Sequence, residues 1–172
     1  MLAIVLLMTG HFAGSVYVRS FLEHVTLLAT GPIALALLGF GIAAVVGNIV
    51  GGRLADANIR MALVVTAVLM AFAALALVLW GVHVGAAFAF VTLWGLAFGM
   101  GPVVLPTNLS RAAPDALEAA GSLMVVSFQV AITIGAVVGG YVVDNYGATA
   151  PLTLTAVLAA STALLALLQP RS

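Results

Sequence analysis

Residues 47–56 read GNIVGGRLAD, and residues 135–144 read GAVVGGYVVD. Three glycines, one valine and the closing aspartate coincide at a constant offset of 88 residues. Each copy closes the second of three long apolar segments, and an odd number of membrane crossings inverts the second set relative to the first. The match therefore predicts an inverted 3+3 repeat, with Asp56 and Asp144 at opposite faces of a membrane. The alternative is a chance similarity between segments rich in Gly and Val.

The apolar character extends over the whole chain. Of its 172 residues, 65% are hydrophobic and 6% are charged, and the mean hydropathy is +1.31. A soluble domain carries about 25% charged residues. A chain this short cannot hide so much apolar surface from water, so its solvent is the lipid bilayer. The net charge is zero and there is no basic tract, which argues against a nucleic-acid partner.

The apolar runs predict an all-α membrane protein with six transmembrane helices. A helix needs roughly 20 apolar residues to cross the hydrocarbon core, and the runs are continuous rather than alternating, which excludes a β-barrel. Residues 1–172 then form a single six-helix transmembrane domain, with internal repeats at about 1–83 and 84–172. The expected spans are 2–18, 31–52, 61–81, 84–106, 120–143 and 149–168.

The N-terminal run has a second interpretation as a cleaved signal peptide. Such a peptide begins with a basic region, whereas Met1 leads directly into Leu-Ala-Ile-Val-Leu-Leu. We therefore assign this run to the first span. Its abrupt start suggests that a preceding part of a larger protein is missing.

The five arginines predict the orientation. Arg53, Arg60 and Arg111 lie in two loops on one side, the C-terminal tail adds Arg171, and the opposite side holds Arg19. Cytoplasmic loops are enriched in basic residues. We therefore expect a multi-pass protein of the plasma (inner) membrane with both termini in the cytoplasm.

The turn after the second span carries a candidate conformational gate, formed by Gly52, Arg53, Asp56 and Arg60. Small residues let a neighbouring helix approach closely, and Asp56 is placed to interact with the positive N-terminus of the next helix. Arg60 offers a fork for a carboxylate or for helix-end carbonyls. These charges suggest a latch that holds one conformation. The alternative is a solvated turn with anchoring charges.

Polar residues inside the spans are candidates for a substrate cavity, because a polar group at this depth should face protein or a water-filled space. Each has a structural alternative: an interhelical hydrogen bond for Gln129, a buried neutral ring for His11 and an interfacial anchor for Tyr17. The four candidates are His11, Tyr17, Asn48 and Gln129.

Other chemistry finds little support in the sequence. No cluster of His, Asp and Glu has metal-ligand spacing, and the glycine pairs lie inside spans rather than in phosphate loops, so we expect no cofactor. Ser122, Ser127 and Thr92 lack a plausible nearby base, which argues against an intramembrane enzyme. Asp115 and Glu118 are read as an N-cap and its N3 partner for the fifth span.

The turn at 52–60 resembles the short cytoplasmic loop motif of the major facilitator superfamily. The matching residues are Gly52, Leu54, Ala55, Asp56 and Arg60; the departures are Ala57, Ile59 and Met61. Weaker likenesses follow in order along the chain and are closest to the twelve-span drug:proton antiporters and the arabinose- and sugar-efflux-like permeases. They comprise 11–23, Trp94 to Gly99 with Pro106, 113–116, and Phe128-Gln129 with 135–144.

This resemblance implies the C-terminal six-helix half of a transporter that exports small organic solutes or drugs by alternating access and proton antiport. It also implies a small-molecule substrate and a partner, either an N-terminal six-helix half or a second copy in parallel. Two alternatives remain open at this point. One is a truncated or split-gene fragment without independent activity, and the other is a structural membrane partner protein.

Overall fold

The computed structural model describes residues 2–112 and 114–168, and all regular structure within them is helical. The sequence provides long runs of Ala, Leu, Val and Gly without charge, and a backbone in lipid must satisfy its own hydrogen bonds. The elements are α1 (Leu2–Ser15), α2 (Val18–His24), α3 (Thr30–Ala57), α4 (Ile59–Trp80), α5 (Val84–Ala112), the 3-10 helix η1 (Pro114–Ala116), α6 (Leu117–Tyr146) and α7 (Ala150–Leu168).

Six segments in the described residues are long and apolar enough to cross a membrane, which confirms the predicted fold class. The first consists of α1 and α2 together and reaches His24, beyond the expected end at residue 18. Helices α3, α5 and α6 have 28 to 30 residues. At 1.5 Å per residue they exceed a hydrocarbon core of about 30 Å, so their ends project from it or the helices tilt.

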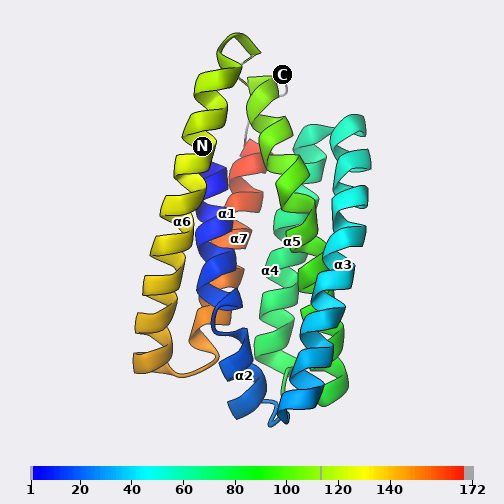
Figure 1. Cartoon of the computed structure of the whole chain (residues 1–172), viewed down its shortest axis with the longest axis vertical. Helices are drawn as coiled ribbons and strands as arrows, with labels where there is room; N and C mark the ends of the chain where they lie inside the picture. Colours follow the sequence, from blue (N-terminus) through cyan, green and yellow to red (C-terminus); the bar gives the residue numbers. More distant parts are fainter. Residues whose placement is uncertain (1, 113, 169–172) are drawn as a thin grey trace.

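The first three spans are α1 with α2, α3 and α4, and the last three are α5, α6 and α7. In the packing, these two sets exchange their first helices. Helix α1 packs on α6 and α7, whereas α5 packs on α3 and α4, and α4 and α7 pack on each other between the two sets. Figure 1 shows α1 beside α6 and α7, and α5 beside α3 and α4. Each set is therefore completed by a helix from the other set.

The repeated glycines lie at two equivalent helix crossings. A Cβ atom added at Gly51 would lie 2.8 Å from the Cα of Met100, and one added at Gly135 would lie 2.6 Å from the carbonyl oxygen of Thr9. Glycine is needed at these positions because the two backbones approach too closely for a side chain. The four contacts are Gly47 with Leu96, Gly51 with Met100, Gly135 with Thr9, and Gly139 with Ala13.

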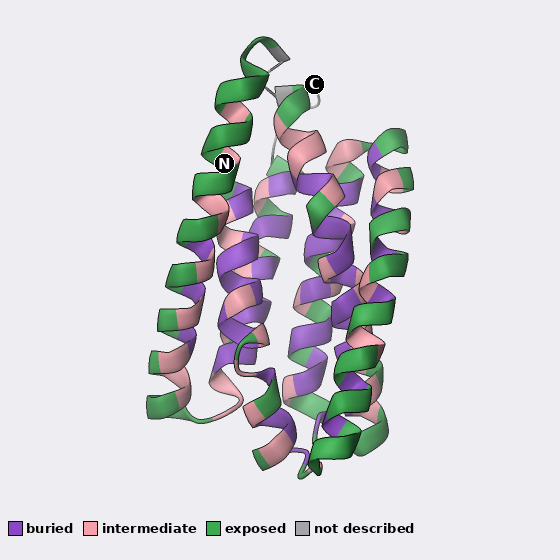
Figure 2. Cartoon of the chain, viewed as in Figure 1, coloured by how far each residue is buried: buried purple, intermediate pink, exposed green. Residues whose placement is uncertain are grey.

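Helices α3 and α6 lie at the outside of the bundle. Only 17% of the most apolar window of each is buried, against 56% for the first span and for α4. Figure 2 shows the same contrast, with green along α3 and α6 and purple along the helices between them. Apolar side chains dominate both exposed faces, so lipid or another helical unit must cover them.

The two ends of the bundle carry different charges. Figure 1 places the N-terminus, the α3–α4 turn and η1 at one end, and α2 and the α6–α7 turn at the other. The end with the N-terminus therefore carries Arg53, Arg60 and Arg111, and the opposite end carries Arg19. Arg171 lies outside the described residues. Asp56 and Asp144 fall at opposite ends, as expected for an inverted pair.

Candidate functional site

An aromatic cluster lies where α1, α3 and α5 meet. The His11 ring stacks on the Phe98 ring, with centroids 4.0 Å apart and an angle of 8° between the planes. Trp94 contacts His11 edge-on, and Phe40 of α3 approaches both His11 and Phe98. His11 is only 3% exposed. The predicted cavity residue of α1 is therefore packed inside the bundle.

His11 and Phe98 occupy equivalent positions in the two repeats. His11 lies midway between the residues that contact the α6 glycines, Thr9 and Ala13. Phe98 lies midway between Leu96 and Met100, which contact the α3 glycines. The stacked pair thus joins matching positions of α1 and α5, and we place the local two-fold relationship of the repeats at this contact.

The cluster contains polar atoms that lack partners. His11 Nδ1 and Trp94 Nε1 are fully buried and make no hydrogen bond within the part of the chain that the structure describes. Buried polar atoms are normally bonded, so such atoms often accompany function or bound water. His11 is also the only His, Asp or Glu buried within a described span.

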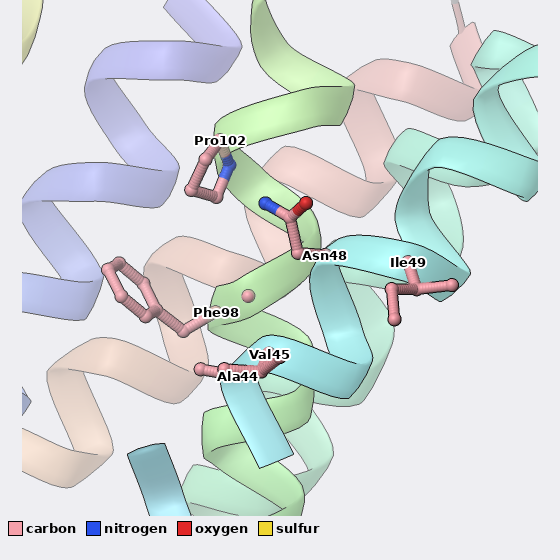
Figure 3. Close-up of a pocket in the computed structure, with 7 residues that line it drawn as sticks. Ala44, Val45, Asn48, Ile49, Phe98 and Pro102 are labelled. Carbon is pink, nitrogen blue, oxygen red and sulfur yellow. The ribbon is translucent and has the colours of Figure 1, made fainter. Parts of the chain in front are cut away.

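A hollow of about 380 Å³ opens beside this cluster, between α3 and α5. We call it the α3–α5 hollow; its walls are Ala44, Val45, Asn48 and Ile49 of α3 and Phe98, Gly99 and Pro102 of α5. Asn48 is the single polar side chain among these seven. Figure 3 shows it on the α3 wall, with Phe98 and Pro102 on the α5 wall. Since Phe98 also stacks on His11, two of the four predicted cavity residues meet around Phe98.

The other two predicted cavity residues lie elsewhere. The Tyr17 hydroxyl donates a hydrogen bond to the Ala136 carbonyl at 2.9 Å, and its ring packs at Gly139 and Gly140 in the α1–α6 seam. Gln129 is exposed on α6, and its side chain makes no hydrogen bond to any described residue. Gln129 therefore makes no interhelical hydrogen bond within the described residues, and its place in a substrate cavity stays a prediction.

The gate residues lie as a group at the arginine-rich end of the bundle. Gly52 is half-buried beside Val103, and Arg53 and Asp56 are exposed. Arg60 donates from Nε to the Ala166 carbonyl at 3.0 Å, and its second branch donates to the Leu167 carbonyl. Of the two partners considered for Arg60, the structure selects helix-end carbonyls, which tie the start of α4 to the end of α7.

The starts of α4 and α6 are capped differently. Asn58 caps α4, because its side-chain oxygen accepts a hydrogen bond from the Met61 N–H at 3.0 Å. The N-cap reading of Asp115 is wrong: Asp115 lies in η1, and α6 starts at Leu117 without a side-chain cap. A 3-10 turn takes the place of the predicted cap.

The sequence analysis missed Asn58, Phe98 and Pro102 as structural or site residues. Asn is among the preferred N-cap residues, and a proline inside an apolar run marks a local break in the hydrogen-bond ladder, so both carried a readable signal. Phe98 carried none by itself, because an aromatic residue in an apolar helix is ordinary. No group of three potential metal ligands occurs in residues 2–112 and 114–168.

Comparison with known proteins identifies relatives across nearly the whole chain. Purine ribonucleoside efflux pump NepI of Salmonella paratyphi C is 38% identical over 164 residues, which covers 95% of this chain and 41% of the relative. The pump of the same name from Escherichia coli O6:H1 is 37% identical over 165 residues, 96% of this chain and 42% of the relative. The chain thus spans about two fifths of the length of these relatives. No solved structure matches.

The family comparison covers the full sequence. The family described as Major Facilitator Superfamily matches residues 1–172. Six membrane-length helices, the paired glycine crossings and the turn at 52–60 agree with this match. The chain is an integral membrane protein that belongs to the Major Facilitator Superfamily.

Proposed function

We propose that this chain forms one six-helix half of a transporter that exports purine ribonucleosides from the cell. The observation that carries the proposal is the similarity of 95% of the chain to a purine ribonucleoside efflux pump. The exposed mid-span Asn48 and Gln129 support it, since polar side chains at that depth need a water-filled space or a protein partner. The more general form of the proposal is export of small organic solutes or drugs.

The cavity of such a transporter lies between two six-helix units, and the exposed faces of α3 and α6 are where we place the second unit. A separate N-terminal half is the partner we favour, because the relatives are more than twice as long as this chain. A parallel pair of identical chains is the second possibility, and the concentration of arginines at one end favours parallel over antiparallel pairing. With that orientation, both termini lie in the cytoplasm.

Transport proceeds by alternating access, in which the two units rock about a site near the middle of the membrane. In our proposal Arg60 keeps α4 and α7 together while the gate residues Gly52, Arg53 and Asp56 move against the second unit. Export is coupled to proton entry. His11 is our candidate for the proton carrier in this half, because it is the buried histidine at the centre of the bundle.

The test compares the chain alone with the chain in a complete assembly. The chain is purified in mild detergent, its mass is measured, and it is reconstituted for flux of inosine and guanosine under a pH gradient. We expect no flux from a monomer and restored flux after co-expression with a six-span N-terminal half. A homogeneous monomer with nucleoside-driven proton flux contradicts the half-transporter proposal. A complete assembly without such flux instead supports the alternatives, a fragment without activity or a structural membrane partner.

A further inference from the structure

Asn48 is an unpaired amide within a membrane-spanning helix. It lies nine residues before the end of α3, which places it about 14 Å inside the helix end. Its side chain is exposed and makes no hydrogen bond with residues 2–112 or 114–168. An amide without a partner is strongly disfavoured in hydrocarbon. The side chain therefore requires water, a ligand or a group of the second unit as its partner.

A second unpaired group lies next to it on α5. Pro102 is inside that helix and has no N–H, so the carbonyl oxygen of Phe98, one turn earlier, lacks its helical donor. In membrane helices such carbonyls are usually bonded by a neighbouring side chain or by water. No described side chain donates to this oxygen. Phe98 and Pro102 both line the α3–α5 hollow, so this carbonyl belongs to a residue of its wall.

The matching place in the other repeat carries no such unpaired amide. Ala136 is the counterpart of Asn48 at the offset of 88 residues. Its carbonyl accepts the hydrogen bond from Tyr17. The fold itself therefore does not need a free amide at this crossing.

The remaining walls suit a flat apolar ring. Gly99 has no side chain, and Ala44, Val45 and the Phe98 ring present apolar surface around the amide. Small-molecule sites are typically apolar hollows with a few polar groups that fix orientation. A side-chain amide offers a donor beside an acceptor, the pattern by which Asn pairs with the edge of a purine base.

We propose that the α3–α5 hollow binds the hydrogen-bonding edge of a purine base. The Asn48 amide N–H donates to the base carbonyl, and the free Phe98 carbonyl accepts the adjacent base N–H; the Asn48 amide oxygen is left for the amino group of guanosine. This inference rests on the proposed function and assigns its substrate contact to three residues, Asn48, Phe98 and Pro102.

The test compares inosine, whose base has an N–H donor beside a carbonyl, with unsubstituted purine riboside, whose base has no N–H donor. Competition for guanosine export by the complete assembly in proteoliposomes gives the relative affinity of each nucleoside. We expect the native protein to favour inosine by about tenfold, the worth of one or two hydrogen bonds. Asn48→Leu removes the amide and keeps the number and branching of the side-chain heavy atoms, and it should reduce this preference to about twofold or less.

Two further variants make the result specific. Pro102→Ala returns an N–H that bonds the Phe98 carbonyl, so it should weaken inosine binding and leave purine riboside unchanged. Thr153→Val is the matched control, since Thr153 is exposed on α7, away from α3 and α6, and its hydroxyl bonds to the Thr149 carbonyl; it should keep the full preference.

The outcomes separate this inference from the proposed function. Export of both nucleosides with equal affinity by the native protein, or an unchanged inosine preference in folded Asn48→Leu, overturns the inference and leaves the transporter intact. Absence of purine ribonucleoside export from the complete native assembly overturns the substrate assignment and this inference together.

Discussion

Arg60, in the first turn of α4, donates a hydrogen bond from Nε to the carbonyl oxygen of Ala166 in the last turn of α7, at a distance of 3.0 Å. The last carbonyls of a helix have no partner inside the helix, and a positive charge interacts favourably with that end. Arg60 therefore joins the third helices of the two repeats at the end of the bundle that carries most of the arginines.

Replacement of Arg60 should weaken this connection. We expect Arg60→Ala to lower the free energy of unfolding by about 1 kcal/mol, because a half-buried, charge-assisted contact to two carbonyls is lost. Arg53→Ala is the control, since Arg53 is exposed and has no partner in the described residues. Reversible unfolding in mixed detergent micelles measures both. Equal stability of the two variants contradicts the role assigned to Arg60.

The glycine crossings predict a sharp difference between two glycines of α3. Gly47→Ala places a methyl group against the backbone of Leu96, whereas Gly41→Ala has nothing within 4 Å. We expect the first to cost about 2 kcal/mol through overpacking and the second to be neutral or favourable by up to about 1 kcal/mol. The same unfolding measurement applies, and a stable Gly47→Ala variant is the contrary result.

Two substitutions of His11 distinguish its role in packing against Phe98 from a role in proton coupling. His11→Ala should cost about 3 kcal/mol, because a fully buried ring is removed. His11→Phe keeps the stacked ring and removes the unpaired Nδ1, so its stability should change by less than about 1.5 kcal/mol.

Flux under a pH gradient distinguishes the role of the His11 ring. If His11 carries the proton, His11→Phe should still bind nucleoside but lose the dependence of export on the gradient. A His11→Phe transporter that remains coupled excludes His11 as the carrier.

Substitution of Asp56 tests whether the turn between α3 and α4 acts as a conformational gate. Asp56→Asn should slow turnover severalfold and leave equilibrium nucleoside binding nearly unchanged, since the residue is exposed at a helix junction away from the hollow. Asp144→Asn changes the equivalent residue at the other end of the bundle and serves as the comparison. Loss of binding in a correctly inserted Asp56→Asn protein is the opposite outcome.

Orientation can be tested cleanly because the chain has no cysteine. Ala57 and His83 are exposed at opposite ends of the bundle. In intact cells, a membrane-impermeant thiol reagent should label His83→Cys and spare Ala57→Cys until the membrane is opened. Labelling in the reverse order means that the termini face outward.

The sequence was sufficient for the number of spans and for the inverted pair, because hydrophobic length and the repeated glycines are local properties. It did not predict which helices meet at those glycines, since Gly47 and Gly135 pack on helices from opposite halves of the chain. Nor did it predict the partner of Arg60, which lies 106 residues away.

For the candidate site too, local sequence properties predicted some features, and the packing of distant helices determined the others. Polarity within a span was enough to select His11 and Asn48. The meeting of both residues at Phe98 depends on the crossing of α1, α3 and α5, which only the three-dimensional structure supplies. Tyr17 carried an equally polar signal and lies in a different seam.

The exchange of α1 and α5 between the two helix sets has a consequence for biosynthesis. The helices that cover α1 are α6 and α7, which begin about 100 and 135 residues after α1 ends. At roughly 5–20 residues per second, translation from the end of α1 to the start of α7 takes on the order of ten seconds. During that interval Thr9 and Ala13 lack the α6 glycines, Gly135 and Gly139, on which they pack. The insertion machinery, a chaperone or surrounding lipid must cover this face of α1 until α6 and α7 have been inserted.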